Sequence, residues 1–298
     1  MPKHSLRLGG YQQESSVHTR ALHHLAGLAS ERLGTTFEPT VNANVTAQGH
    51  RAGDLLTMVE DGRLDACYFA SSYLAARVPS LTVFDLPFVA TDRGRDYAKL
   101  DGEFGVRLAA DVAARTGYRV LGYWDNGFRH ISNHVRSLRC PDDCKGLRLR
   151  TLDNTFHQQI FAALGFEPLF LDTKDLADAV ARHTVDAQEN PLTNLVNFGL
   201  YHTHRHVSLT SHFFGVALFL VNGPWFDGLA PPAQVGLRLI ADETTTRQRA
   251  LAVAEDARCL DILKSDGVTI VPAEEIDWSA FRSAVQPVVE REITRLGG

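Results

Sequence analysis

The sequence has no strong excess of charge of one sign and no long hydrophobic run. Its 298 residues contain 30 Lys and Arg against 35 Asp and Glu, which leaves a formal net charge of −5. That balance gives no global attraction to nucleic acid or to an anionic membrane. The longest apolar run, residues 216–221, is far shorter than the ~20 residues of a membrane-spanning helix and suits a buried strand. Length and average composition therefore predict a globular chain of about two domains.

Cysteine is also scarce, with four residues in the whole chain. Cys67 falls in a predicted strand and Cys259 in a predicted helix, where both are expected to be buried and inert. Cys140 and Cys144 are near enough for a disulfide, and the spacing leaves the bonded and the free state open. A metal site would need further ligands that this pair lacks, so we expect no metal and no other cofactor.

Motifs of the common enzyme classes are missing. The sequence contains no Gly-x-Ser-x-Gly elbow, no Gly-x-x-x-x-Gly-Lys-Ser/Thr loop, no His-Glu-x-x-His and no Gly-x-Gly-x-x-Gly after a strand. Three histidines, His202, His204 and His206, are spaced for one face of a strand. Because Arg205 stands among them and no Cys or carboxylate accompanies them, we predict a solvated loop rather than a zinc site.

Helical and strand patterns alternate along the whole chain. Ser15 or Ser16 is placed to cap a first helix, and a helix of more than thirty residues is predicted from Pro231 to about Lys264. Strands are predicted at 6–8, 37–45, 64–69, 118–124, 147–151 and 207–221, with a turn at 125–127. Strands separated by single helices imply βαβ units and a largely parallel sheet.

One segment is repeated. Residues 55–66 resemble residues 176–187, and in each copy a helix and a short turn lead into a strand that starts with Asp-Ala. Coincidence within one sheet is possible, but two similar domains explain the repeat better. We predict one domain from 1–124 and 213–252, and another from 125–212 and 253–298, with the ligand cleft between them. Ligands of open α/β sheets bind outside the carboxyl ends of the strands, here just past each copy.

Arginines stand beside the predicted strands. Arg148 and Arg150 share one face of the strand at 147–151 by alternation, and Arg129 follows the predicted turn. An arginine at the carboxyl end of a strand suits two-point recognition of a carboxylate, although an ordinary ion pair would explain the same spacing. An enzyme that clamps its substrate with these arginines and uses His212 or Asp153 as a base is the alternative from another class.

Five stretches of the chain together resemble the substrate-binding proteins of tripartite ATP-independent periplasmic (TRAP) transporters. They are Leu-Pro-Phe at 86–88, Tyr-Trp-Asp-Asn-Gly-Phe-Arg at 123–129, Pro-Asp-Asp-Cys-Lys-Gly-Leu-Arg-Leu-Arg at 141–150, Ala-Leu-Gly at 163–165 and Val-Asp-Ala-Gln-Glu-Asn-Pro at 185–191. The resemblance covers nearly the whole chain, and the Gln-Glu-Asn-Pro run at this distance after the arginine strand is its most specific part.

The resemblance implies an α/β fold of the two-domain periplasmic-binding-protein (Venus flytrap) type. Each domain would be a mixed, mostly parallel sheet flanked by helices, with the long late helix as a brace. It implies a monomeric protein that captures a small organic acid, closes around it and delivers it to a membrane permease. It also implies a periplasmic location, with the leader absent from this sequence. A ligand sensor for a membrane signalling partner is the alternative, and an enzyme is less favoured.

The resemblance also implies roles for single residues. Arg150 maps onto the arginine that pairs with the ligand carboxylate, Arg129 onto a second polar contact, and Asn190 onto the amide that orients the same carboxylate. Thr173 stands where an aromatic residue often packs on the ligand. Asp153 replaces a commonly neutral residue, and would either accept a hydrogen bond from the ligand or neutralise an arginine.

Further lining residues are expected from both domains. They are Tyr11, Gln12, Tyr68, Ser71, Ser72 and Tyr73 from the first domain, together with His212 and Phe213 (or Phe214) where the chain crosses back. The serines and Asp153 indicate a hydroxylated acid, whereas the aromatic residues would also accept an aromatic or branched acid. The sequence leaves the ligand's identity open.

Overall fold

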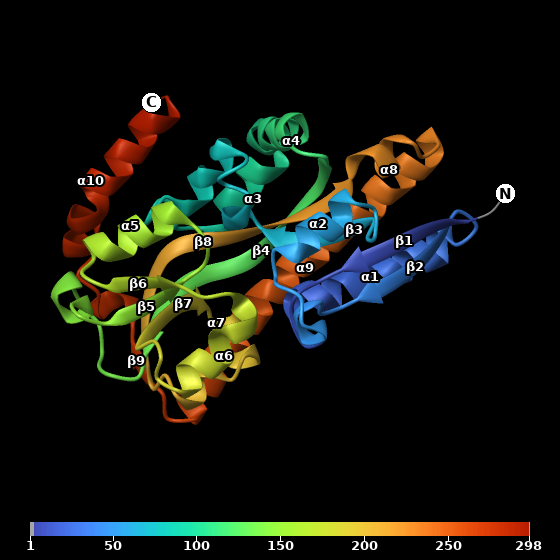
Figure 1. Ribbon diagram of the computed structural model, residues 1–298. Coiled ribbons are helices and arrows are strands. Elements are labelled where there is room, and N and C mark those ends of the chain that lie inside the picture. The colour runs from blue at the N-terminus through green and yellow to red at the C-terminus, as the bar shows by residue number, and fades with distance from the viewer. Residues whose placement is uncertain (1–2, 298) are drawn as a thin grey trace. The chain divides into compact units, whose positions relative to one another are not determined.

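The computed structural model describes residues 3–297, in which strands and helices alternate (Figure 1). The strands are β1 (His4–Gly9), β2 (Phe37–Asn42), β3 (Ala66–Ala70), β4 (Tyr118–Asn133), β5 (Arg148–Thr151), β6 (Glu167–Phe170), β7 (Ala187–Pro191), β8 (His206–Asn222) and β9 (Thr269–Val271). The helices are α1 (Val17–Leu33), α2 (Asp54–Glu60), α3 (Arg93–Asp101), α4 (Glu103–Arg115), α5 (Thr155–Ala163), α6 (Thr173–Ala181), α7 (Leu192–Asn197), α8 (Gly223–Asp227), α9 (Pro231–Ser265) and α10 (Trp278–Leu296). The predicted α/β class is confirmed.

The described chain forms two compact units. The first unit contains the residues up to Ser71, Gly94–Asn126 and Val216–Ala254, and the second contains Ser72–Arg93, Gly127–Gly215 and the residues from Glu255 onward. Apart from shifts of two or three residues at the other boundaries, these limits differ from the predicted domains in residues 72–93, which we had assigned to the first domain. Asn154 binds Asp85 at 2.9 Å, and the Phe88 N–H donates to the carbonyl of His212 at 2.8 Å. The segment therefore packs within the second unit.

The first unit is built on a mixed sheet with the strand order β2-β1-β3-β8. β1 is parallel to β2 and β3, whereas β8 runs antiparallel to β3. Helix α1 lies along β1 and β2 (Figure 1, blue) and begins at Ser16, whose hydroxyl accepts the Thr19 N–H. The core of the first unit contains Trp124, which stacks on Phe219 with ring centroids 5.1 Å apart.

The second unit has the strand order β4-β7-β5-β6, with β7 antiparallel to β4 and β5 parallel to both β6 and β7. Helix α5 packs on β5 and β6, and α10 packs on α5. The buried core under these helices includes Phe156, Ile160, Phe161, Phe213, Phe281 and Val285. β5 is thus flanked by strands on both sides, which fixes the direction of its side chains.

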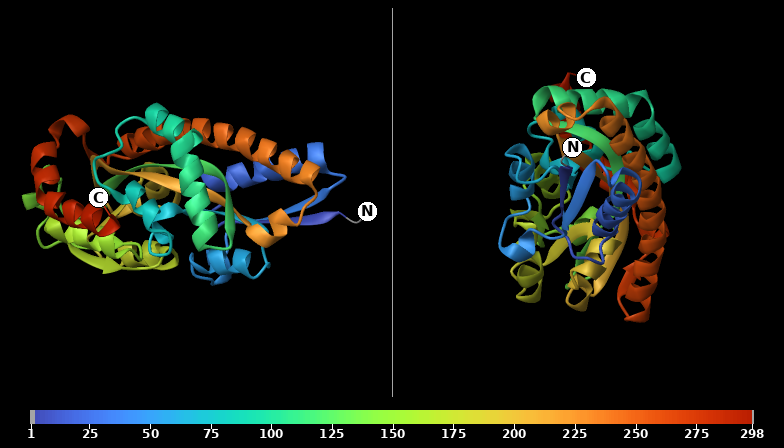
Figure 2. Two further views of the ribbon diagram at one scale, coloured as in Figure 1. Left: turned by 90° about the horizontal axis from the view of Figure 1, so that it is seen from above. Right: turned by 90° about the vertical axis from the view of Figure 1, so that its right-hand side faces the viewer.

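The long late helix predicted from the sequence is confirmed. α9 runs unbroken over 35 residues, and Figure 2 shows it as one continuous helix (orange to red). Within residues 3–297, no helix combines the length and the apolar composition that crossing a membrane requires.

The two copies of the sequence repeat adopt the same local structure, one in each unit. Asp65 accepts hydrogen bonds from the backbone N–H of Arg7 and from its guanidinium at 2.7 to 2.9 Å. Asp186 accepts the same set from Arg148 at 2.8 to 2.9 Å, and these bonds lower the pKa of Asp186 to about 2. The pair β1 and β3 in the first unit therefore corresponds to the pair β5 and β7 in the second.

By this correspondence, Gly9 is the counterpart of Arg150. Leu8 pairs with Ala66 and Leu149 pairs with Ala187, and Gly9 and Arg150 are the residues that follow. A Cβ atom at Gly9 would lie only 2.4 Å from Leu64 Cδ1 and 2.8 Å from Leu55 Cδ1. In the first unit, the side chains of Leu55 and Leu64 occupy the space that an arginine at position 9 would need. Arg150, the residue predicted to pair with the ligand carboxylate, therefore has no counterpart at Gly9.

The predicted turn at 125–127 is wrong, because β4 continues as one strand through these residues. Two turn-forming side chains are used as buried hydrogen-bonding groups instead. Asn126 Oδ1 lies 2.8 Å from His18 Nε2, and Tyr97 donates to the Asp125 carboxylate. Gly127 retains the positive φ, +79°, that its residue type suggested.

Replacing Gly127 by Ala is expected to lower the free energy of unfolding by about 1–2 kcal/mol, the cost of a left-handed backbone for an L-residue. The new Cβ would also lie 2.8 Å from Pro191 Cβ. Chemical denaturation measures the loss. Gly117→Ala is the matched control, since its Cβ meets no atom within 4 Å, and equal stabilities of the two variants would contradict the argument.

All four cysteines are free thiols in the structure. Cys144 is the buried last residue of the short helical turn Pro141–Cys144, and burial raises the pKa of its thiol. Cys140 lies at the start of the same turn, with its Sγ 3.5 Å from a carboxylate oxygen of Asp143. The two residues serve as parts of this turn.

Candidate functional site

Arg150 lies in β5 of the second unit, in register with Leu169 of β6 and Gln188 of β7. Only 2% of its surface is exposed. Its Nε donates to the carbonyl of Leu171 at 2.9 Å, and its Nη2 donates to Thr173 Oγ1 at 3.4 Å. No Asp or Glu among residues 3–297 forms an ion pair with it. The guanidinium is a buried cation whose protein partners are neutral.

Other buried or half-buried arginines have an acid of their own. The pairs are Arg129 with Glu189, Arg93 with Asp256, Arg249 with Asp101, Arg148 with Asp186 and Arg7 with Asp65. A cation held out of water without a counter-charge is costly, and a bound carboxylate would supply that charge in two-point geometry. Arg150 therefore differs from these arginines in the way that an anion-binding residue should.

Two hydroxyl groups accompany Arg150. Thr173 is the first residue of α6 and follows the capping residue Asp172. The Tyr73 hydroxyl lies 3.3 Å from Thr173 Oγ1. Tyr73, Thr173 and Arg150 thus come from three different elements and meet in the second unit. Thr173 was predicted at a position for ligand packing, and its hydroxyl instead helps to hold the arginine.

Arg129 and Asn190 belong to an adjoining polar network between β4 and β7. The Arg129 guanidinium binds the Glu189 carboxylate at 2.5 and 2.7 Å, and its Nη2 lies 3.4 Å from Asn190 Oδ1. The Asn190 amide donates to Gln188 Oε1 at 2.6 Å and accepts from Asn194 at 3.0 Å. Glu189 balances the charge of Arg129, so a ligand contact by Arg129 stays a prediction.

Glu189 is fully buried and is the residue of this site that the sequence did not single out. Burial opposes its ionisation, but the Arg129 charge and hydrogen bonds from His212 and Arg129 outweigh that effect and hold the pKa of the carboxyl below its usual range. The signal that could have revealed it is an acid inside the Gln-Glu-Asn-Pro motif, on the strand paired with Arg129.

His212 lies behind this pair. Its Nε2 is 3.3 Å from the Glu189 carboxylate, and its Nδ1 is 2.7 Å from Thr210 Oγ1. Burial lowers the pKa of the imidazole, against the raising effect of Glu189. His212 is 1% exposed and supports Glu189, and a ligand contact by His212 stays a prediction.

One of the two roles predicted for Asp153 is wrong. Asp153 is exposed on the loop after β5, and its carboxylate neutralises no arginine in the described part of the chain. A hydrogen bond from Asp153 to the ligand stays a prediction. Phe213 is a core residue, because its ring stacks on His157 with centroids 4.5 Å apart and meets Phe161 edge-on.

The predicted residues of the first unit are buried together at one end of its sheet. Tyr68 is fully buried, and its hydroxyl accepts the Tyr11 N–H at 3.3 Å, so it is a core residue rather than a lining one. Gln12 and Ser71 are 2% and 1% exposed. A ligand contact by Tyr11, Gln12 or Ser71 stays a prediction.

The segment around the three clustered histidines is partly buried, contrary to the predicted solvated loop. His204 is fully buried, with Nδ1 3.0 Å from Ser132 Oγ, and burial lowers the pKa of its ring to about 3. Within residues 3–297, no three His, Cys, Asp or Glu side chains are arranged to hold a metal ion.

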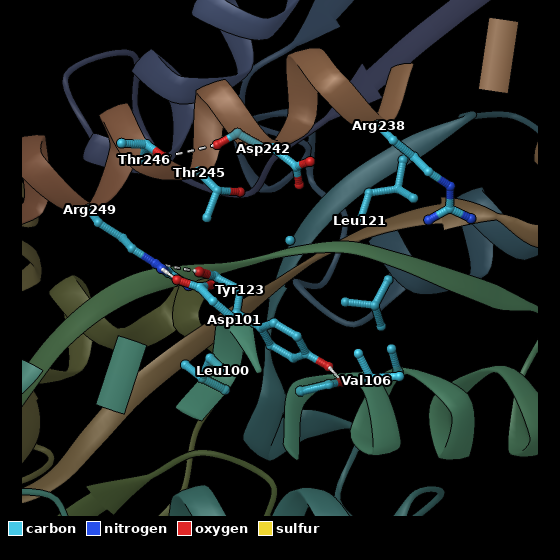
Figure 3. Close-up of a pocket in the computed structure, with 14 residues that line it drawn as sticks. Leu100, Asp101, Val106, Leu121, Tyr123, Arg238, Asp242, Thr245, Thr246 and Arg249 are labelled. Atoms are coloured by element: carbon cyan, nitrogen blue, oxygen red, sulfur yellow. Dashed lines mark hydrogen bonds and ion pairs between the residues drawn. The ribbon is translucent and has the colours of Figure 1, made fainter. Parts of the chain in front are cut away.

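A separate groove of about 570 Å³ lies within the first unit, between α9, α4 and β4 (Figure 3). Arg249 on one side pairs with Asp101 at 2.7 Å and donates to the carbonyl of Tyr123. Arg238 and Asp242 project from α9, and burial raises the pKa of the Asp242 carboxyl. Two arginines and two acids line the groove, so it offers no net positive charge to an organic acid.

The chain is similar in sequence to known proteins over most of its length. Residues 8–295 match the family model described as bacterial extracellular solute-binding protein, family 7. A solute-binding protein of Verminephrobacter eiseniae is 31% identical over 230 residues, covering 77% of this chain and 68% of that protein. The 2,3-diketo-L-gulonate-binding periplasmic protein YiaO of Escherichia coli is 29% identical over 231 residues, 78% of this chain and 70% of its own length.

A solved structure has the same fold. The sugar acid binding protein DctPAm of Advenella mimigardefordensis, in complex with galactonate, superposes with a TM-score of 0.93 at 26% identity. The alignment covers 100% of this chain and 95% of that protein.

Proposed function

The chain belongs to the bacterial extracellular solute-binding proteins of family 7, and from that premise we propose that it binds a hydroxylated acid with a single carboxylate at Arg150. The family membership confirms the resemblance to TRAP solute-binding proteins. The observation that carries the proposal is the buried Arg150 guanidinium, which has only a carbonyl and a hydroxyl as protein partners. A carboxylate is the ligand group that completes its hydrogen bonds and its charge.

The residues around Arg150 favour one carboxylate over two. Arg129 is already neutralised by Glu189, so a second carboxylate would be buried without a counter-charge of its own. The hydroxyls of Tyr73 and Thr173 suit a polyhydroxylated chain, because a hydroxyl can donate and accept. Two of the relatives are named for acids of this class, 2,3-diketo-L-gulonate and galactonate, whereas two others are named for C4-dicarboxylates.

We propose the wider role on the same basis. Relatives named as periplasmic binding proteins support a location outside the cytoplasmic membrane, where the protein would act as a monomer and pass its acid to a TRAP permease. The binding-protein family and the neutral surroundings of Arg150 favour release of an unchanged ligand over catalysis. Galactonate recovered unaltered after incubation, by mass spectrometry, is the expected result.

Calorimetric titration with three ligands of one carbon skeleton tests the ligand class. Galactonate carries one carboxylate, galactitol carries none and galactarate carries two. We expect galactonate to bind at least about tenfold more tightly than galactarate, a difference of ~1.4 kcal/mol, and galactitol to give no heat. At 100 times its Kd, galactonate should add ~2.7 kcal/mol to the free energy of unfolding. Equal binding of galactitol would contradict the role of Arg150.

A further inference from the structure

Asp85 is a buried carboxylate at the end of the short helical segment Pro79–Asp85 in the second unit, with 1% of its surface exposed. Its Oδ1 accepts the Ser72 hydroxyl at 2.5 Å and lies 2.8 Å from His157 Nε2. Its Oδ2 accepts the Asn154 amide at 2.9 Å. Both carboxylate oxygens are therefore occupied by side chains from two other chain segments.

Those two segments carry the acid-binding site. Ser72 directly precedes Tyr73, whose hydroxyl reaches Thr173. Asn154 lies four residues after Arg150, on the loop between β5 and α5, and its side-chain oxygen caps α5 by accepting the His157 N–H. The Asn154 amide also donates to the carbonyl of Ser72 at 3.2 Å. Asp85 and Asn154 thus join the two segments directly.

These contacts complete a closed circuit around the site. Arg150 and Asn154 lie on the same chain segment, and Asn154 binds Ser72. Tyr73, the next residue, contacts Thr173. Thr173 in turn accepts a hydrogen bond from Arg150 Nη2. The two contacts nearest the ligand position are long, at 3.3 and 3.4 Å, and hold little on their own. The shorter hydrogen bonds of Asp85 to Ser72 and Asn154 determine the positions of the two segments that carry Tyr73 and Arg150.

We infer that Asp85 is a positioning residue of the acid-binding site, holding Tyr73 and the loop after Arg150 in the arrangement that a ligand carboxylate meets. The inference rests on the proposed function. It gives a role to an acid that touches no ligand-binding group itself. Preorganisation of this kind raises affinity because the binding groups need not be ordered when the ligand arrives.

The chemistry at position 85 requires a carboxylate. Ser72 Oγ and Asn154 Nδ2 both donate to it, one to each oxygen. An asparagine has the same shape but only one acceptor oxygen, so its own amide would face one of the two donors. Asp85→Asn should therefore lose the hydrogen bond to either Ser72 or Asn154, with little change in packing.

The test is the affinity for galactonate, measured by calorimetric titration. Asp85→Asn is expected to weaken binding by about 10-fold or more, and the milder Ser72→Ala by a few-fold. The double variant Asp85→Asn/Asn154→Asp exchanges donor and acceptor at the shared bond and keeps an oxygen to cap α5. It is expected to recover part of the affinity lost by Asp85→Asn, because a carboxylate at position 154 cannot donate to the carbonyl of Ser72.

Asp65→Asn is the matched control. Asp65 is also buried and also holds a serine, Ser5, but it lies in the first unit and its other partner is Arg7. We expect it to lower the thermal midpoint and leave the Kd for galactonate within about 2-fold. Equal losses of affinity in Asp65→Asn and Asp85→Asn, or no recovery in the double variant, would reduce Asp85 to general stability and overturn the inference.

A second readout requires no ligand. The Nε–H resonance of Arg150 in a nitrogen-15 spectrum should shift in Asp85→Asn and stay in place in Asp65→Asn. A wild-type protein that binds no sugar acid but shows this shift contradicts the proposed function alone. An Arg150 resonance that is unchanged in Asp85→Asn overturns the positioning role, whichever acid the protein binds.

Discussion

Arg150→Met is expected to remove measurable binding of galactonate while the protein still folds. Truncating one partner of a buried, hydrogen-bonded charge pair costs about 2–5 kcal/mol, which is roughly 30-fold to several thousand-fold in Kd. No acid loses its partner in this variant, because Arg150 has none among residues 3–297. Calorimetric titration measures the loss of binding, and circular dichroism with a thermal scan measures the fold.

Arg148→Met is the control from the same strand. Arg148 pairs with Asp186, and its side chain is 41% exposed, so we expect a change in stability with galactonate binding retained. Arg150→Lys should bind poorly as well, because an ammonium group cannot reproduce the planar two-point contact of a guanidinium. Affinity close to wild type in Arg150→Met would remove the basis of the carboxylate assignment.

The elements of the fold were predictable because their signals are local. Ser16 caps α1 with its own hydroxyl. Pro231 and Pro232 open the pattern of α9, and no later proline interrupts it before Ser265. The repeat predicted two equivalent strand pairs, and Asp65 and Asp186 form the same bonds in each. In all these cases the residues that determine the structure lie within one helix or one strand pair.

The predictions that were wrong concern residues whose partners are distant in the sequence. Asp-Asn-Gly at 125–127 has the composition of a turn, but Asn126 bonds to His18 and Asp125 to Tyr97, and with these tertiary bonds β4 continues through the three residues. Residues 72–93 follow a first-unit strand in the sequence, yet Asn154 binds their Asp85. Local propensity cannot anticipate such contacts.

The site was predictable in part for the same reason. Arg150 was found from its place at the end of a strand and from the motif around it. The acid that neutralises Arg129 was not, because which arginine Glu189 meets depends on the antiparallel register of β4 and β7. Phe213 was misplaced because the sequence does not tell which face of β8 packs under α5.

Glu189→Gln is expected to lower the free energy of unfolding by about 3–5 kcal/mol, because it leaves the buried Arg129 charge without its partner. The Arg129 side chain is 8% exposed and that of Glu189 is 0% exposed, so water cannot replace the lost charge. Urea denaturation at neutral pH measures the loss. Glu275→Gln, in an exposed pair with Arg139, is the control and should cost at most about 1 kcal/mol.

Acid provides an independent test of the same pair. The pKa of Glu189 is lower in the folded protein than in the unfolded chain, so its contribution is complete above the unfolded value of ~4.3 and declines as the pH falls toward the lowered value. The stability difference between wild type and Glu189→Gln should therefore shrink below about pH 4. Arg129→Met/Glu189→Leu, which removes both charges, should regain most of the stability that Glu189→Gln loses. A double variant as unstable as Glu189→Gln would mean that the hydrogen bonds to Asn190, and not the buried charge, stabilise β4 against β7.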